Sequence, residues 1–426
     1  MSLAKKLGLA TKAQRSWVLY DWANSAFPTI MMTAVLPLYY SGVAGKDLES
    51  HQATAYWGYT SSLALAIIAF MSPFFGALAD LRQWKKNLLF VFTIVGIIAS
   101  GLMSMVGPGD WLLASMFFIL GNIGFALADI FYGSLLPSIA KPNETSRVSS
   151  AGYAIGYLGG GLLLAFDLAL IQKPELFGLQ DAGTGVRWSF VSVAFWWGLF
   201  SIPLFKNVPE PQKSTQCRMA EISFWEPLKQ VWTTLKSVRQ YKNTFLFLAA
   251  FWAYNDGIGT IIKMATIFGK EVGIETSDLI GAILMVQFVG LPATLILGQV
   301  ATKIGDKTSL MICLVVYSII CILGYYMTEG WQFWLLAGLV SLVQGPAQAL
   351  SRSLFVKLTP PEKSAEFFGF YSFSGKFAGI IGPLLFAILT QLFEGSRYAI
   401  LAIIVLFIIG AVLLSRVKES ETPPPT

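Results

Sequence analysis

The chain has 426 residues, of which 55% are hydrophobic and only 13% are charged. In soluble globular domains about a quarter of the residues are charged, so this composition excludes a soluble globular protein. The formal net charge of +6 comes from basic loops between long apolar runs, which is typical of membrane proteins and not of nucleic-acid-binding ones.

Apolar runs of the length that a helix needs to cross a bilayer recur along the chain. They lie at about residues 17–40, 52–80, 87–107, 111–138, 148–171, 187–205, 244–268, 277–302, 308–327, 333–356, 367–393 and 398–415. A transmembrane barrel would show shorter segments of alternating polarity instead. The sequence therefore predicts an all-α membrane protein with twelve transmembrane helices.

Lys and Arg residues gather in the tails and in alternate loops. On the opposite side lie only Lys46, Lys173, Arg187, Lys270 and Arg397. Because basic loops stay in the cytoplasm, this asymmetry predicts that both termini are cytoplasmic. We expect a multi-pass, monomeric protein of a bacterial inner membrane.

The first span carries Asp21 and Asn24, which are three residues apart and therefore share one face of a helix. Pro28 follows one turn later and is expected to bend the helix. Span four carries Asp129, and span seven carries the pair Asn255 and Asp256.

A short turn of Gly, acidic and basic residues joins spans two and three at residues 76–86. A weaker copy follows about half a chain later at residues 298–307, with Thr302 in the acidic position. Two copies of one turn predict two similar halves. We expect the residues of these turns to control the opening of the protein: Gly76, Asp80, Arg82, Gly298, Lys303 and Gly305.

Glycines repeat between the halves as well, because Gly156 and Gly160 of span five correspond in offset to Gly375 and Gly379 of span eleven. The predicted units are an N-terminal six-helix bundle (1–205), a linker (206–243), a C-terminal six-helix bundle (244–415) and a disordered tail (416–426). Apolar residues of the linker recur at helical spacing between 224 and 238, which predicts an amphipathic helix on the inner membrane surface.

Two six-span halves with a repeated Gly-rich basic turn resemble the major facilitator superfamily. Within it, the string Tyr20-Asp21-Trp22-Ala23-Asn24-Ser25-Ala26-Phe27 resembles the start of the vacuole-effluxer-like family. The resemblance implies a secondary transporter that works by alternating access. The fungal namesakes export amino acids from the vacuole, so the resemblance implies efflux of an amino-acid-like or peptide-like solute.

In the superfamily pattern, spans one, four, seven and ten line a central cavity. Charges at mid-bilayer cost about 2.5–3.5 kcal/mol on insertion scales, so each needs a function or a pairing. We expect the polar residues at this depth to bind the substrate: Asp21, Asn24, Asp129, Asn255, Asp256, Gln344, Gln348 and Lys376. The alternative is that these residues pair with one another and fix helix packing.

Carboxylates around a central lysine suit a zwitterionic or amphipathic organic solute. No His or Cys cluster accompanies the acids, so we expect no metal and no cofactor. Carboxylates at this depth can load and release protons near neutral pH, and we expect Asp21, Asp129 or Asp256 to couple transport to protons.

One basic and one acidic residue near the inner face have predicted contacts. Arg352 falls near the inner end of span ten, where we expect it to reach lipid phosphates. Asp80 is placed to meet the amino-terminal end of span eleven, at residues 365–367, where the helix dipole favours a carboxylate.

Three other functions are alternatives to the transport of such a solute. A lipid-like or drug-like amphiphile is an alternative substrate, and a cavity open sideways to lipid would favour it. A non-transporting receptor or an enzyme is the alternative from another class, but no nucleophile–base pair and no extra soluble domain is visible. The absence of a G-x-x-x-x-G-K-[ST] motif argues against an ATP-driven pump.

Overall fold

A computed structural model describes residues 9–48, 50–211, 226–236, 240–271, 274–392 and 396–418. The described residues are overwhelmingly helical, and no strand occurs among them. The first span is built from α2 (Lys12–Asn24), the π-helix η1 (Phe27–Ala34), α3 (Leu36–Tyr39) and the π-helix η2 (Tyr40–Ala44).

The remaining helices follow in chain order. The first half continues with α4 (Ser50–Arg82), α5 (Lys85–Leu102), η3 (Met103–Met105), α6 (Trp111–Ser134), α7 (Leu136–Ile139), α8 (Thr145–Gln172), η4 (Pro174–Phe177) and α9 (Ala182–Asn207). The linker contributes α10 (Glu226–Lys236). The second half holds α11 (Lys242–Glu271), α12 (Thr276–Ile304), α13 (Asp306–Tyr326), α14 (Gly330–Leu358), η5 (Pro361–Lys363), α15 (Ser364–Leu392) and α16 (Ser396–Ser415).

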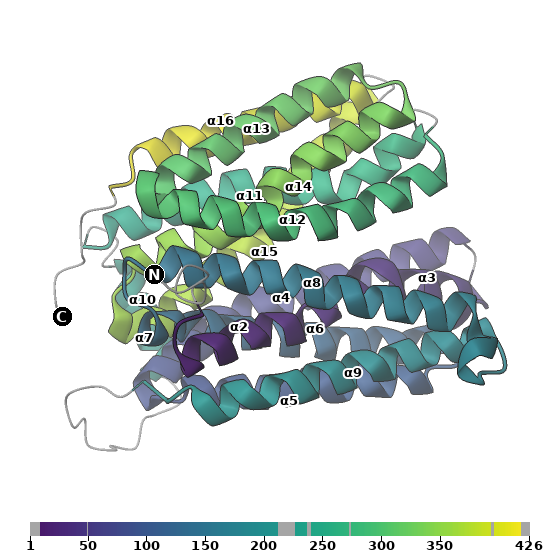
Figure 1. Cartoon of the computed structure of the whole chain (residues 1–426), viewed down its shortest axis with the longest axis horizontal. Helices are drawn as coiled ribbons and strands as arrows, with labels where there is room; N and C mark the ends of the chain where they lie inside the picture. The colour runs from purple at the N-terminus through teal and green to yellow at the C-terminus, as the bar shows by residue number, and fades with distance from the viewer. Residues whose placement is uncertain are drawn as a thin grey trace.

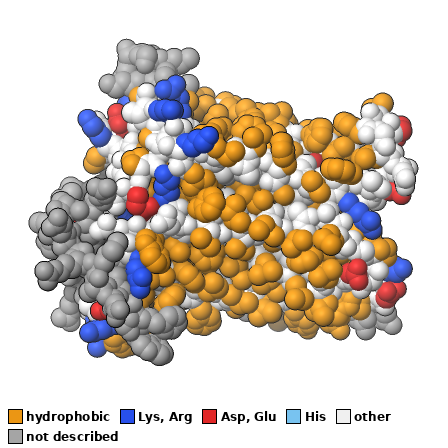
Figure 2. Space-filling view, turned by 90° about the horizontal axis from the view of Figure 1, so that it is seen from below, with side chains coloured by type: hydrophobic (Ala, Val, Ile, Leu, Met, Phe, Trp, Pro, Cys, Tyr) orange, Lys and Arg blue, Asp and Glu red, His pale blue; other side chains and the backbone are white. Residues whose placement is uncertain are grey.

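The helices have the length and polarity of membrane spans. In the described part of the chain, 11 segments are long and apolar enough to cross a bilayer, and α15, with 29 residues, is the remaining long helix. Figure 2 shows apolar side chains covering the middle of one face, with charged side chains gathered toward its two ends. The predicted all-α fold with twelve transmembrane helices is confirmed.

The helices form two bundles, α2 to α9 and α11 to α16, which lie side by side (Figure 1). They meet where α4 packs on α15 and where α8 packs on α12 and α14. The start of α2 and the end of α16 lie at the same end of the molecule (Figure 1), which we call the terminal end. The residue boundaries given above for the two halves stay a prediction.

The glycines of span five allow α8 to pack closely against α2. A Cβ atom at Gly156 would lie 2.6 Å from the Ser25 hydroxyl oxygen, and one at Gly159 would lie 2.6 Å from the Trp22 carbonyl oxygen. Only glycine permits this approach of two helices. The glycine repeat therefore positions α2, the helix that carries Asp21 and Asn24.

The first span changes helix type directly after these polar residues. The α-helix ends at Asn24, and Pro28 occupies the start of the π-helical segment that follows. Proline has no N–H to donate, so the regular helical pattern is interrupted there. Segments of π-helix are frequent at functional sites.

The amphipathic helix predicted in the linker is present as α10. Its Pro227 and Thr234 are buried, whereas Leu228 and Trp232 are 42% and 60% exposed. It packs on α4. The rest of the predicted helical segment, Cys217, and residues 419–426 of the predicted tail lie outside the described residues.

Candidate functional site

Asp21 and Arg352 form an ion pair between the two bundles. The Arg352 Nη2 atom lies 3.0 Å from Asp21 Oδ2, and both residues are buried. Asp21 belongs to α2 and Arg352 to α14, so this pair joins the first span to the tenth. The same guanidinium donates hydrogen bonds to α8, from Nε to Ser149 Oγ at 2.9 Å and from Nη2 to the Ser149 carbonyl at 3.0 Å.

Aromatic rings surround the Arg352 guanidinium. Its carbon Cζ lies 4.3 Å from the ring centroid of Tyr153, 4.7 Å from Trp17 and 5.4 Å from Tyr132. A guanidinium within about 6 Å of aromatic faces gains cation–π attraction. The expectation that Arg352 reaches lipid phosphates is therefore wrong. Distance from the span end was a poor guide, because α2 and α8 cover this part of α14.

Asp129 belongs to α6 and lies near this pair. It is exposed, although its chain neighbours Ala128 and Ile130 are buried. It lies within electrostatic range of Arg352, Asp21 and Lys376. Lys376 comes from α15 of the other bundle. The structure thus brings together, between the bundles, the predicted acids Asp21 and Asp129, the predicted Lys376, and Arg352, which was expected to reach lipid phosphates instead.

The polar residues of α11 and α14 form a second group. Gln348 Nε2 donates to Asn255 Oδ1 at 2.9 Å. Gln344 lies beside the Tyr157 side chain of α8. Asn24 is buried at the last position of α2.

Asp256 is placed differently from the other predicted acids. It is 1% exposed, and its Oδ2 accepts a hydrogen bond of 2.7 Å from the backbone N–H of Gly382 in α15. This contact lies inside the second bundle. It joins α11 to α15 next to Pro383, where the α15 backbone lacks a donor.

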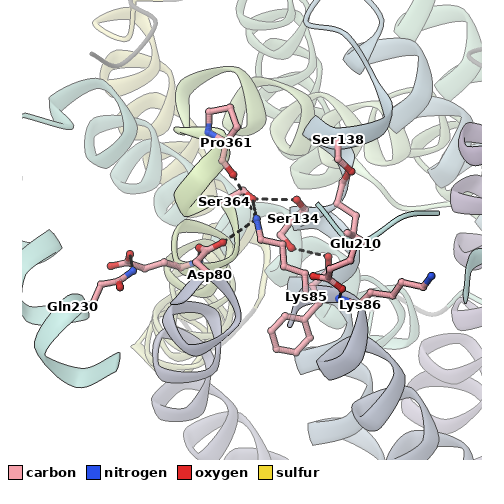
Figure 3. Close-up of polar contacts among 12 residues, drawn as sticks. Asp80, Lys85, Lys86, Ser134, Ser138, Glu210, Gln230, Pro361 and Ser364 are labelled. Atoms are coloured by element: carbon pink, nitrogen blue, oxygen red, sulfur yellow. Dashed lines mark hydrogen bonds and ion pairs between the residues drawn. The ribbon is translucent and has the colours of Figure 1, made fainter. Parts of the chain in front are cut away.

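At the terminal end, the turn between α4 and α5 contacts the start of α15 (Figure 3). Asp80 Oδ2 accepts a hydrogen bond of 2.7 Å from the Glu366 backbone N–H, and Asp80 Oδ1 lies 2.9 Å from Lys85 Nζ. Lys85 also donates to Ser364 Oγ at 2.6 Å. Asp80 therefore meets the amino-terminal end of α15 at the position that the sequence predicts.

The surroundings of this turn explain how it is held. Gly76 packs against the Ala365 carbonyl, and Arg82 lies over the Trp84 ring at 4.9 Å. Glu210, beyond the end of α9, accepts a hydrogen bond of 2.8 Å from the Lys86 backbone N–H (Figure 3). Burial raises the pKa of the Glu210 carboxyl above its ordinary value.

The second turn uses an acid that sequence reasoning missed. Asp306, the first residue of α13, accepts hydrogen bonds of 2.6 Å from Ser146 of α8 and from Ser353 of α14, and lies 2.8 Å from Lys357 Nζ. Thr302, in the position that corresponds to Asp80, bonds only within its own turn in the described contacts. In the second turn the carboxylate therefore follows Gly305, at Asp306, instead of preceding it at position 302.

The remaining predicted residues of this turn differ in their surroundings. Gly298 packs against the side chain of Ser150 in α8. Gly305 has a φ of +89°, a conformation that favours glycine, and it separates α12 from α13. Lys303 is exposed. Both turns thus join the bundles at the terminal end, and the acidic residues that do so are Asp80 and Asp306.

Sequence comparisons point to one family. Residues 43–422 match the family described as "Vacuole effluxer Atg22 like". The MFS-type transporter YxiO of Bacillus subtilis (strain 168) is 38% identical over 414 residues, which cover 97% of this chain and 96% of YxiO. Autophagy-related protein 22 of Yarrowia lipolytica (strain CLIB 122 / E 150) is 24% identical over 436 residues, which cover 82% of this chain and 73% of that protein.

Solved structures agree on the fold. The proton:xylose symporter XylE bound to 6-bromo-6-deoxy-D-glucose has a TM-score of 0.71 at 15% identity and covers 96% of this chain and 95% of its own. The transporter FucP in the outward conformation has a TM-score of 0.68 at 11% identity and covers 98% and 100%. The chain therefore belongs to the Atg22-like vacuole effluxer family of major facilitator superfamily transporters.

Proposed function

We propose that this membrane transporter exports an amino-acid-like or peptide-like solute by alternating access. The observation that supports the proposal is the charged group between the bundles, in which the exposed Asp129 of α6 lies within electrostatic range of Lys376 of α15. A zwitterion carries an ammonium group and a carboxylate, and these complement the two side chains.

The neighbouring groups are chemically suited to the same cargo. The amide pair of Asn255 and Gln348 offers further donors and acceptors for a peptide or amino-acid backbone. In the described part of the chain, no group of three His, Cys, Asp or Glu residues is placed to hold a metal ion. Substrate binding by Asp21, Asn24, Asp256 and Gln344 belongs to the same proposal.

Alternating access requires the terminal end to open. In the described conformation, Asp80, Asp306 and Arg352 each join the two bundles at that end. We therefore propose that this conformation admits substrate from the opposite end of the molecule. Opening the terminal end means breaking these contacts together, so they control the exchange between the two states.

Protons provide a means of breaking one of them. Protonation of Asp21 removes the charge that pairs with Arg352, and Asp129 and Asp256 are the further candidates for coupling. A proton that crosses the membrane potential supplies about 2.3 kcal/mol per 100 mV. The proposed orientation has both termini in the cytoplasm of a bacterial cell, and the proposed unit is a monomer.

An amphiphile is the second candidate substrate. It is favoured by a cavity of about 460 Å³ that lies outside the charged group, against α4, α11 and α15, and has mostly apolar walls. Its walls hold neither Asp129 nor Lys376, so an amphiphile bound there would not use the charged group.

A thermal-shift screen of the purified protein with amino acids, short peptides, sugars and lysolipids tests the proposal. A ligand at 100 times its Kd stabilises the folded state by about 2.7 kcal/mol. We expect a shift with an amino acid or peptide that is lost in Asp129→Asn and in Lys376→Gln and is kept in Ser41→Ala, an exposed position. A shift with lysolipid alone, unchanged in both variants, would support the amphiphile instead.

A further inference from the structure

A lateral groove lies where the linker helix α10 meets helices of both bundles. It holds about 460 Å³, and its walls include Pro73 of α4, Leu235 of α10, Phe245 and Trp252 of α11, and Phe370 of α15. Apart from Ser374, the walls are apolar or aromatic. Cavities of this size are large enough to bind a small organic group.

The groove opens toward the bilayer. Ala249, in its wall, is exposed. A second hollow of about 280 Å³ beside it includes Phe70 and Leu228, which are 75% and 42% exposed. An apolar surface of this kind is unfavourable in water. Because the protein is embedded in a membrane, the molecules that cover it are acyl chains.

Two lysines lie near the groove without forming part of its walls. Lys363 Nζ lies 3.3 Å from the Tyr241 hydroxyl, and the Tyr241 ring packs edge-on against Phe367 at 5.1 Å. Tyr241 stands one helical turn before Phe245 of the groove wall. Lys363 has three donors, and the tyrosine takes one of them.

The second lysine comes from α10. Lys236 follows Leu235 of the groove wall, and its Nζ atom lies 5.2 Å from the Trp232 ring centroid. Lysine at this level, where helices begin and end, is placed to meet phosphate groups of lipids. The acidic Glu366 is buried, accepts a hydrogen bond of 2.6 Å from Gln230 and also lies within electrostatic range of Lys363.

We propose that a bilayer phospholipid with an acidic headgroup binds in this groove, with one acyl chain against Phe245, Ala249 and Trp252 and its phosphate on Lys363 and Lys236. The proposal rests on the membrane location of the protein and does not depend on an amino-acid or peptide cargo, whereas the amphiphile considered above as a second candidate would occupy this same groove. Because the walls belong to both bundles, relative movement of the bundles changes the shape of the lipid site.

Trp252 provides a direct reporter. The full-length protein is reconstituted in vesicles of phosphatidylcholine and phosphatidylglycerol at equal mole fractions, with bromine on the acyl chains of one lipid at a time. The Trp252 signal is the difference in fluorescence quenching between the native protein and Trp252→Phe. We expect stronger quenching by brominated phosphatidylglycerol than by brominated phosphatidylcholine.

The matched controls separate this site from the general lipid shell. The same difference taken with Trp331→Phe, at an exposed tryptophan at the start of α14, is expected to show no headgroup preference. Lys363→Gln is expected to lower the preference at Trp252 about fivefold, the contribution of one surface lysine. Lys173→Gln, at an exposed lysine after α8, is expected to leave it unchanged.

Three results would overturn the proposal. Equal quenching of Trp252 by both lipids would mean that only ordinary surrounding lipid touches it. An equal loss of preference in Lys173→Gln and Lys363→Gln would mean that the headgroup preference comes from the overall charge of the protein and not from this site. Undiminished quenching in Ala249→Phe, which fills the groove, would place the acyl chain elsewhere, and the lysine variants decide the matter if that variant does not fold.

Discussion

Arg352 and Asp21 connect α14 and α2 across the interface between the bundles, with Nη2 and Oδ2 3.0 Å apart. Both partners are buried, and three aromatic rings surround the guanidinium. Removing one partner of a buried pair costs about 3–5 kcal/mol, because the other charge is left uncompensated. The loss affects only the conformation in which the pair exists.

The first prediction concerns this pair. Asp21→Asn is expected to shift the protein toward conformations that are open at the terminal end. The reporter is Ser150→Cys, whose site is 1% exposed and packs against Gly298. Labelling of this cysteine by a membrane-impermeant maleimide, in a Cys217→Ser background, should become at least tenfold faster in vesicles that present the terminal end. Ser41→Cys, at an exposed position, is the control, and its labelling rate should be the same with and without Asp21→Asn if the variant is correctly folded.

Arg352→Lys separates charge from shape. Lysine keeps the positive charge but lacks the planar fork that bonds Asp21 and Ser149 together. We expect it to speed labelling of Ser150→Cys by an intermediate amount. Labelling as slow as in the native protein would mean that the charge alone holds the bundles together.

The second prediction concerns Asp80. Asp80→Asn removes the charge that interacts with Lys85 and with the positive end of α15. A carboxylate at a helix amino terminus is favourable by about 0.3–1 kcal/mol, and by up to about 2 kcal/mol when partly buried. The variant should therefore favour the form that is open at the terminal end, with faster labelling of Ser150→Cys. Unchanged labelling would leave Asp80 as a residue of the turn without a role in gating.

The third prediction compares two positions in the second turn. Asp306→Asn weakens contacts to Ser146, Ser353 and Lys357, so it should open the terminal end as Asp80→Asn does. Thr302→Ala should have no effect, because the described bond of this side chain stays in its own turn. The opposite ranking of the two variants in the labelling experiment would contradict the assignment of the acidic role to Asp306.

Sequence patterns predicted those features that depend on neighbours along the chain. The spans follow from apolar length, and the contact of Asp80 with the start of α15 follows from a repeated turn and a helix dipole. The environment of Arg352 did not follow, since its partners come from α2, α6 and α8. Asp306 was missed for a related reason, because an acid in the first turn of a helix is common and its partners Ser146 and Ser353 come from two other helices.

The fourth prediction tests close packing between the bundles. A Cβ atom at Gly76 would lie 3.0 Å from the Ala365 carbonyl carbon and would overlap its oxygen. Gly76→Ala should therefore destabilise the closed terminal end by about 1–3 kcal/mol and speed labelling of Ser150→Cys. Gly259→Ala in α11 is the matched control, because no atom lies within 4 Å of its added Cβ. Equal labelling rates in the two variants would mean that the contact of Gly76 with Ala365 does not influence the separation of α4 and α15.

The fifth prediction concerns the coupling ion, and it distinguishes the three predicted acids by their surroundings. Asp21→Asn loses an ion pair with Arg352, and Asp129→Asn loses a charge within electrostatic range of Arg352 and Lys376. Asp256→Asn keeps an oxygen that can accept the Gly382 N–H bond, so its fold should be least affected.

Solute uptake into vesicles is measured between pH 5.5 and 8.5 with and without a proton gradient. We expect one of the first two variants to lose the response to the gradient while solute exchange continues. If all three variants keep the native pH dependence, proton coupling through these acids is wrong, whereas loss in Asp256→Asn alone would move the coupling site into the second bundle.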